Sequence, residues 1–224
     1  MNADSALSRL CGRLRAELGD DARDIVIDTG AGAAGTPRVV VPAWDPADEA
    51  AAARELLARA DVVALLDAAD APATSRRSAV VVVGLPSPGA LSDADAGVDH
   101  GTAGAELVDL WARRGRGGRG PGRVAWVGGR GPAPLAEALE AWAGGRAVVT
   151  LPGVRDHGLL RRGLALRART AAEVVEATDY LLGAPALTRA LAARGRDAIA
   201  ALPTAAEVAD RLRDAARPAI GGRP

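Results

Sequence analysis

The sequence lacks several residue types, and each absence limits what the protein can contain. It has no Phe, Lys or Gln, and only one Tyr, one Met and one cysteine, Cys11. A single cysteine excludes an intramolecular disulfide and a cysteine-based zinc site. With so few aromatic rings, Ala, Leu and Val must fill the core around four tryptophans. The exclusive use of arginine in place of lysine is typical of a GC-rich, bacterial genome.

An excess of charge and a long apolar run are also missing. The 28 basic and 28 acidic side chains give a formal net charge of zero, so no overall field favours nucleic acid or an anionic lipid surface. The longest apolar runs, such as 79–85, are too short to cross a bilayer. The first residues carry an acid and arginines where a signal peptide needs an apolar core. We therefore expect a cytoplasmic protein with no membrane span and no nucleic-acid partner.

Short apolar segments alternate with helical patterns along the chain. Strands are predicted over 24–28, 38–43, 61–66, 79–84, 123–128, 146–151 and 164–167. Helices are predicted over 5–18, 46–60, 102–114, 134–143, 170–182, 185–202 and 204–216. Continuous Val runs suit strands that are buried on both faces, as in a parallel sheet. The alternation predicts an α/β fold with a doubly wound, mainly parallel Rossmann-like sheet and helices on both faces.

We interpret the predicted strands and helices as parts of one domain. Apolar residues make up 49% of the 224 residues, enough for a sizeable core. We expect a single α/β domain over 1–216, from the N-terminal helix 5–18 to the C-terminal helices within 170–216, followed by a tail over 217–224. The strands 79–84, 123–128 and 146–151 are expected to be neighbours in one sheet.

The loop 127–132, VGGRGP, is the first candidate for a ligand site, because ligands bind outside the carboxyl ends of strands in such folds. Gly128, Gly129 and Gly131 allow a close approach of the backbone. Arg130 adds positive charge beside the start of a helix, which favours a phosphate. The segment lacks the G-x-G-x-x-G spacing and the lysine of a P-loop, so a simple glycine-rich turn is the alternative.

The loop 151–158, LPGVRDHG, follows the next strand and is a second candidate. Gly153 allows a tight turn. Arg155, Asp156 and His157 are suited to bind the hydroxyls or phosphates of a ligand. A solvated polar turn explains the same residues equally well.

Two charged loops favour no function. The acidic loop 93–100 fails the EF-hand pattern at Val98 and Gly104, so we expect no metal site there. The arginine run over 113–123 resembles an RNA-binding segment but lacks aromatic residues and a basic chain around it. We expect it to be a mobile, exposed connection.

Nucleophilic catalysis has little support in the sequence, and no catalytic residue is assigned. Ser87 lacks the glycine two residues earlier that a nucleophile elbow needs. Cys11 lies on an amphipathic helix, where packing is its expected role. Nothing brings His100 or His157 together with a serine and an aspartate.

Residues 137–153, EALEAWAGGRAVVTLPG, carry a resemblance to a known family. This stretch resembles the E-A-x-A-x-G-x-P-V-V segment in the C-terminal, nucleotide-sugar-binding half of GT-B glycosyltransferases of the group 1, family 4-like type. Downstream, GLALRARTAAEVVEATDYLLGAPALTRALAARGRDAI is similar to the closing pattern of that family. Upstream, RVVVPAWDPADEAAAARELLARADVVALL resembles the strand–helix–strand unit that often precedes the donor site. The likeness covers two segments, about 37–66 and 134–202.

The resemblance implies a role for Glu140, which aligns with the family's glutamate that binds the ribose hydroxyls of the nucleotide. A carboxylate is physically suited to accept two hydroxyl hydrogen bonds. Three features depart from the family. The acid that retaining members carry eight residues earlier is Pro132 here, no Arg or Lys clamp follows 79–84, and the chain is too short for a separate acceptor-binding half. Catalysis is therefore expected to be lost, or shared with a protein partner that supplies an acceptor domain.

The sequence thus predicts a glycosyltransferase-like protein that binds a nucleotide sugar, with no further cofactor, at the carboxyl edge of a parallel sheet. The alternative is a noncatalytic α/β partner or scaffold module that has lost the donor site. A third interpretation is a small-molecule hydrolase or another transferase, because a fold alone does not decide function. The predicted binding residues are Gly128, Gly129, Arg130, Gly131, Glu140, Gly153, Arg155 and His157.

Overall fold

The protein divides into two compact units. The computed structural model describes residues 6–23, 25–28, 39–42, 60, 62–65, 79–82, 86, 105–116, 123–128, 133–154, 159–160 and 163–221. The first unit contains residues 1–87 and 202–224, and the second contains residues 88–201. The single α/β domain expected over 1–216 stays a prediction.

In the first unit, short apolar segments form a parallel sheet. The strands are β1 (Ile25–Asp28), β2 (Val39–Pro42), β3 (Val62–Leu65) and β4 (Ala79–Val82), which lie side by side in chain order. The register places Val39 opposite both Ile25 and Val62. Each strand lies inside a segment whose β-branched residues predicted it, so these strand predictions are confirmed.

Two helices that are far apart in the sequence pack together in this unit. α1 (Ala6–Leu18) contacts α7 (Ala205–Gly221), and α7 also contacts β2 and β3. The leucines whose spacing predicted α1 are buried: Leu7, Leu10, Leu14 and Leu18. The predicted helices over 5–18 and 204–216 are therefore confirmed, and burial of one face of each is what stabilises them.

Arg213 of α7 connects this helix to the end of α1. Its Nε donates to Asp21 Oδ2 at 2.7 Å, and its Nη2 donates to the carbonyl oxygen of Glu17 at 2.7 Å. Asp21 lies in the 3-10 turn η1 (Gly19–Arg23) that follows α1. Hydrogen bonds to Asp21 and Asp210 raise the pKa of the guanidinium above its ordinary value.

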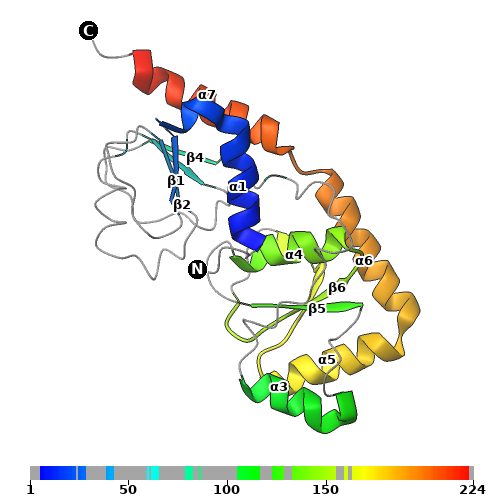
Figure 1. The fold of residues 1–224 in the computed structure, drawn as a ribbon. Helices are drawn as coiled ribbons and strands as arrows, with labels where there is room; N and C mark the ends of the chain where they lie inside the picture. Colours follow the sequence, from blue (N-terminus) through cyan, green and yellow to red (C-terminus); the bar gives the residue numbers. More distant parts are fainter. Residues whose placement is uncertain are drawn as a thin grey trace. The chain divides into compact units, whose positions relative to one another are not determined.

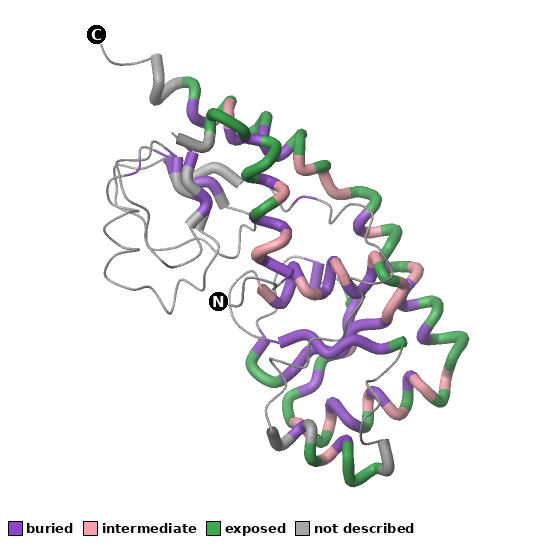
Figure 2. Tube along the Cα trace, in the orientation of Figure 1, coloured by how far each residue is buried: buried purple, intermediate pink, exposed green. Residues whose placement is uncertain are grey.

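The second unit has a parallel sheet of its own. β5 (Val124–Val127), β6 (Ala147–Thr150) and β7 (Ala165–Arg167) lie in this order, with Val149 of β6 opposite Trp126 and Leu166. Every residue of β5 and β6 is buried (Figure 2). Burial at all positions is expected for strands that are covered on both faces.

Helices cover both faces of this sheet (Figure 1). They are α3 (Ala105–Trp111), α4 (Ala133–Ala143), α5 (Ala171–Gly183) and α6 (Pro185–Ala200). α4 and α6 pack on each other and on one face, while α5 packs on the opposite face together with α3. Alternate strand residues such as Val124, Trp126 and Val149 share a core with α3 and α5, as the two-residue period of a strand requires.

A tryptophan pair organises the core between this sheet and α3 and α5. The rings of Trp111 and Trp126 meet edge to face, with centroids 5.4 Å apart. Trp126 Nε1 donates to Thr178 Oγ1 at 2.9 Å, and that hydroxyl donates to the carbonyl oxygen of Val174 at 2.7 Å. The buried indole N–H of Trp126 is thereby satisfied by a side chain of α5, which makes its burial tolerable.

The glycine pair after α4 ends the helix and directs the chain into β6. Gly145 has a φ of +69°, a left-handed conformation that glycine adopts readily. Its N–H donates to the carbonyl oxygen of Trp142 at 2.9 Å, and the Arg146 N–H donates to that of Ala141 at 2.8 Å. These are the two bonds of a Schellman motif. The predicted end of the helix over 134–143 is confirmed.

The prediction that 79–84, 123–128 and 146–151 are neighbours in one sheet is wrong in part. β5 and β6 pair in parallel as expected, but β4 pairs with β3 in the sheet of the first unit. The Val run predicts a buried parallel strand, yet it carries no information about which sheet buries it. The boundary between the two units falls at residues 87 and 88, just after this strand.

Two other predicted segments are only partly described. The helix over 46–60 lies outside the described residues apart from Ala60. The arginine run over 113–123 begins in a π-helical turn (Ala112–Arg116) that extends α3. There Arg114 lies 3.6 Å from Asp179 Oδ2 of α5, so this part of the run has a partner in the fold. Residues 117–122 lie outside the described part of the chain.

Candidate functional site

The carboxyl ends of β5, β6 and β7 meet at one edge of the second unit's sheet. Gly128 follows β5, Gly153 and Val154 follow β6, and Arg167 to Arg169 end β7 and lead into α5. Parallel pairing brings these three chain segments to the same edge. In sheets of this kind the carboxyl edge is where ligands bind.

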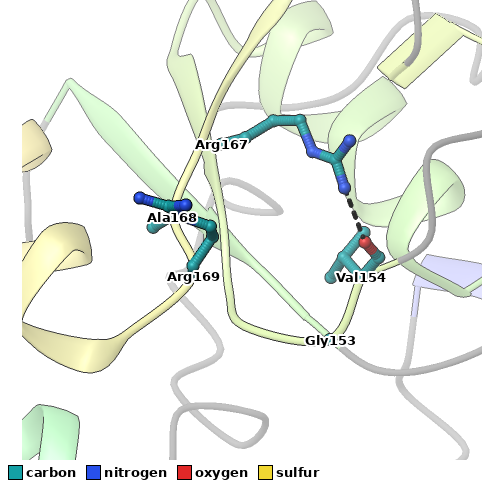
Figure 3. Close-up of a pocket in the computed structure, with 5 residues that line it drawn as sticks. All are labelled: Gly153, Val154, Arg167, Ala168 and Arg169. Atoms are coloured by element: carbon teal, nitrogen blue, oxygen red, sulfur yellow. Dashed lines mark hydrogen bonds between the residues drawn. The ribbon is translucent and has the colours of Figure 1, made fainter.

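A hollow of about 580 Å³ opens between the loop after β6 and the end of β7 (Figure 3). Its lining residues are Gly153, Val154, Arg167, Ala168 and Arg169. This volume falls within the usual range for small-molecule sites. Two of the lining residues are arginines, so the local charge favours an anionic ligand.

Arg167 connects the two walls of the hollow. Its Nη2 donates to the carbonyl oxygen of Val154 at 3.2 Å, and Figure 3 shows the guanidinium extended toward that residue. The side chain thus lies across the hollow in an orientation that is fixed by the protein.

Arg169 interacts with Glu173 in the first turn of α5. The Arg169 backbone N–H donates to Glu173 Oε2 at 2.8 Å, and its Nη2 lies 3.4 Å from Oε1. Thr170 caps the helix, since its Oγ1 accepts from the Glu173 N–H at 3.1 Å. The backbone hydrogen bond is the main cause that lowers the pKa of Glu173. In Figure 3 the Arg169 guanidinium lies on the opposite side of the chain from that of Arg167.

Gly128, predicted to let a phosphate approach the backbone, is buried against Leu151. A Cβ at position 128 would lie 2.5 Å from Leu151 Cδ1 and 3.2 Å from Cγ. The Gly128 N–H donates to Glu137 Oε2 at 3.1 Å. Packing and this carboxylate therefore account for the glycine, and the donor that a phosphate would need is already engaged.

Glu140 does not line the hollow. α4 runs from the carboxyl end of β5 back toward the amino end of β6, and Glu140 lies in its second half. Its charge acts on Arg146, the residue that precedes β6: burial lowers the pKa of Arg146, and Glu140 partly offsets this effect. Glu137, one turn earlier, is the acid of α4 whose carboxylate reaches the end of β5.

The structure thus brings together some predicted residues and places others elsewhere. Gly153 lines the hollow and adopts a φ of +86°. Gly129, Arg130, Gly131, Arg155 and His157 lie outside the described residues. Sequence reasoning missed Arg167 and Arg169, which end the short predicted strand 164–167 and directly follow it. The signal was their position, because basic residues at a strand's carboxyl end point to the ligand edge.

Comparisons with known proteins give no relative from which a function could be transferred. No protein-family model matches the chain, and no curated protein matches it significantly. None of the helices in the described ranges is both long and apolar enough to cross a membrane. In the same part of the chain, no group of three or more His, Cys, Asp or Glu side chains is placed to hold a metal ion.

Proposed function

We propose that the second unit binds a nucleotide sugar at the carboxyl edge of β6 and β7, as a glycosyltransferase-like donor site on a doubly wound, Rossmann-like sheet. The observation that carries this proposal is the hollow beside Arg167 and Arg169. Its position at the carboxyl ends of parallel strands and the positive charge of its two arginines suit a diphosphate, with the Arg167 guanidinium toward Val154 and that of Arg169 turned toward Glu173. The proposal concerns the second unit alone, which has a parallel sheet of its own.

In this proposal Arg167 is the principal phosphate ligand. Its Nη2 donates to the Val154 carbonyl at 3.2 Å, and a guanidinium is chemically suited to form a charge-assisted pair with a phosphate oxygen. Preorientation lowers the entropy that is lost when the ligand binds. In this proposal Glu140 keeps the ribose-binding role that the family resemblance implies, although it does not line the hollow and its charge acts on Arg146.

Binding is tested first by thermal shift and titration calorimetry with UDP, GDP, ADP and UDP-glucose. A ligand that binds only the folded state raises the unfolding temperature. Arg167→Ala is expected to weaken binding by about 1.5–3 kcal/mol, the range for a hydrogen bond to a charged group. Arg194→Ala is the matched control, since Arg194 is an exposed arginine of α6 in the same unit. Equal affinity in wild type and Arg167→Ala, or no binding of any nucleotide, contradicts the proposal.

A second candidate function is a noncatalytic α/β module that binds a protein partner. The observation in its favour is that charged groups near the predicted donor site have partners within the protein: Glu137 with Gly128, Arg169 with Glu173, and Glu140 beside Arg146. Glu140→Ala separates the two candidates. On the donor-site proposal it weakens nucleotide binding with little change in unfolding temperature. On the module proposal it changes only stability, because it removes a charge that supports Arg146.

A further inference from the structure

A carboxylate already occupies donors of Arg169, one of the two arginines of the hollow. Glu173 engages both the backbone N–H and the guanidinium of this residue. The Arg169 side chain is nevertheless 88% exposed, so little besides Glu173 holds it in place. The side chain therefore has room to turn once that carboxylate is displaced or neutralised.

We infer that Glu173 competes internally with the ligand's phosphate for Arg169, and so limits the affinity of the hollow. This inference rests on the proposed function. A carboxylate and a phosphate offer the same charge and the same paired acceptor oxygens to a guanidinium, so one excludes the other. With Glu173 engaged, Arg167 binds the phosphate alone. When Glu173 releases Arg169, the Arg169 guanidinium can turn from its present side of the chain toward the ligand.

The size of the effect follows from the exposure of the pair. An exposed ion pair contributes little, so its loss should tighten phosphate binding by about two- to fivefold and no more. Glu173→Gln is the appropriate variant, because glutamine keeps the size of the side chain and an oxygen that can accept from the Arg169 N–H. The substitution therefore removes only the negative charge of Glu173.

The matched control is Glu207→Gln. Thr204 and Glu207 of α7 repeat the Thr-Ala-Ala-Glu sequence of Thr170 and Glu173. Glu207 Oε2 accepts from the Thr204 N–H at 2.7 Å, and the Glu207 N–H donates to Thr204 Oγ1 at 3.2 Å. This helix start belongs to the first unit. Any effect that comes only from loss of a capping charge therefore appears in both variants.

The experiment measures the dissociation constant of UDP by titration calorimetry for wild type, Glu173→Gln, Glu207→Gln and the double variant Arg169→Ala/Glu173→Gln. We expect tighter binding in Glu173→Gln, unchanged binding in Glu207→Gln, and loss of the gain in the double variant. The inference is wrong if the affinity of Glu173→Gln is unchanged, if Glu207→Gln shows an equal gain, or if the gain persists in the variant without Arg169. In each of these cases, UDP binding by the wild type would still support the proposed function. If no protein of the set binds UDP, both the proposed function and this inference are wrong.

Discussion

Individual residues of the second unit show how closely a core poor in aromatic side chains must be packed. Trp142 of α4 is fully buried, and Gly195 of α6 lies directly against its ring. A Cβ at position 195 would lie 2.7 Å from Trp142 Nε1 and closer still to two ring carbons. The largest side chain of this face therefore requires the smallest residue opposite it.

Gly195→Ala is expected to destabilise the second unit by about 1–3 kcal/mol, the usual cost of overpacking. Gly183→Ala is the control, because nothing lies within 4 Å of a Cβ at that exposed position of α5. There the change should be neutral or slightly stabilising. Urea unfolding followed by tryptophan fluorescence measures both. Equal stability of the two variants would mean that the Trp142 ring has room to move.

At the scale of single elements, the helix starts at Thr170 and Thr204 are capped by the same kind of hydrogen bonds. In each, the threonine hydroxyl accepts from the N–H of the glutamate three residues later, and that glutamate's carboxylate accepts from a backbone N–H at the helix start. This is a capping box or a close variant of it. Both helices were predicted to begin at these threonines, over 170–182 and 204–216.

The capping carboxylates should make part of the stability depend on pH. Backbone hydrogen bonds lower the pKa of Glu173 and of Glu207. A lowered folded pKa means that the stabilisation is present above the unfolded value of about 4.3 and is lost as the pH falls through the folded pKa. The double variant Glu173→Gln/Glu207→Gln should therefore unfold at a lower temperature than wild type at pH 7.

The same comparison at pH 3 should show a smaller difference between the two proteins, since a larger share of the wild-type carboxylates is protonated there than at pH 7. Differential scanning calorimetry at both pH values gives the two differences. A gap in unfolding temperature that stays constant from pH 7 to pH 3 would show that the charge of these glutamates does not contribute to capping.

The elements could be predicted from the sequence, but their assignment to sheets could not. Val runs and helical patterns act over a few residues, and the elements that they predicted lie at the expected places in the described part of the chain. The partner of β4 depends on packing between segments far apart in the chain. For the candidate site, the sequence pointed to the sheet edge at which the hollow lies and to Gly153. It did not find Arg167, because a single basic residue at the end of a short strand resembles any exposed arginine.

The direction of α4 determines which of its two glutamates lies near the carboxyl edge of the sheet. Glu137 and Glu140 are three residues apart on α4, and a family pattern selected Glu140 for the ligand. α4 starts near the carboxyl edge and leads away from it, so the earlier glutamate is the one that reaches Gly128. Each residue of a helix advances the chain by about 1.5 Å, so three residues shift a side chain by about 4.5 Å along the axis.

At the scale of the whole molecule, the reactivity of the Cys11 thiol reports when the first unit opens, independently of the second unit. Cys11 is the only cysteine of the chain, and it is 1% exposed on α1. Burial raises the pKa of its thiol to about 11. A thiol reagent at pH 8 should therefore react only after this unit opens, because reaction needs an accessible thiolate.

Arg213→Ala should speed the labelling of Cys11, since it removes the bonds that join α7 to Asp21 and Glu17. Arg217→Ala is the control on the same helix, because the ion pair of Arg217 with Asp214 stays within α7. Labelling is followed by mass spectrometry of the intact protein under native conditions. Equal rates in both variants would show that Arg213 does not hold the helix in place.

The division into units also has a consequence for synthesis on the ribosome. The strands of the first unit and α1 are made before residue 88, whereas α7, which contacts β2 and β3, is made after residue 201. At the usual rate of translation, the intervening segment takes on the order of 10 s to make. During that time the sheet surface that α7 later covers lacks its native helix. The second unit is one continuous segment, so all of its helices and strands have emerged before α7 completes the first.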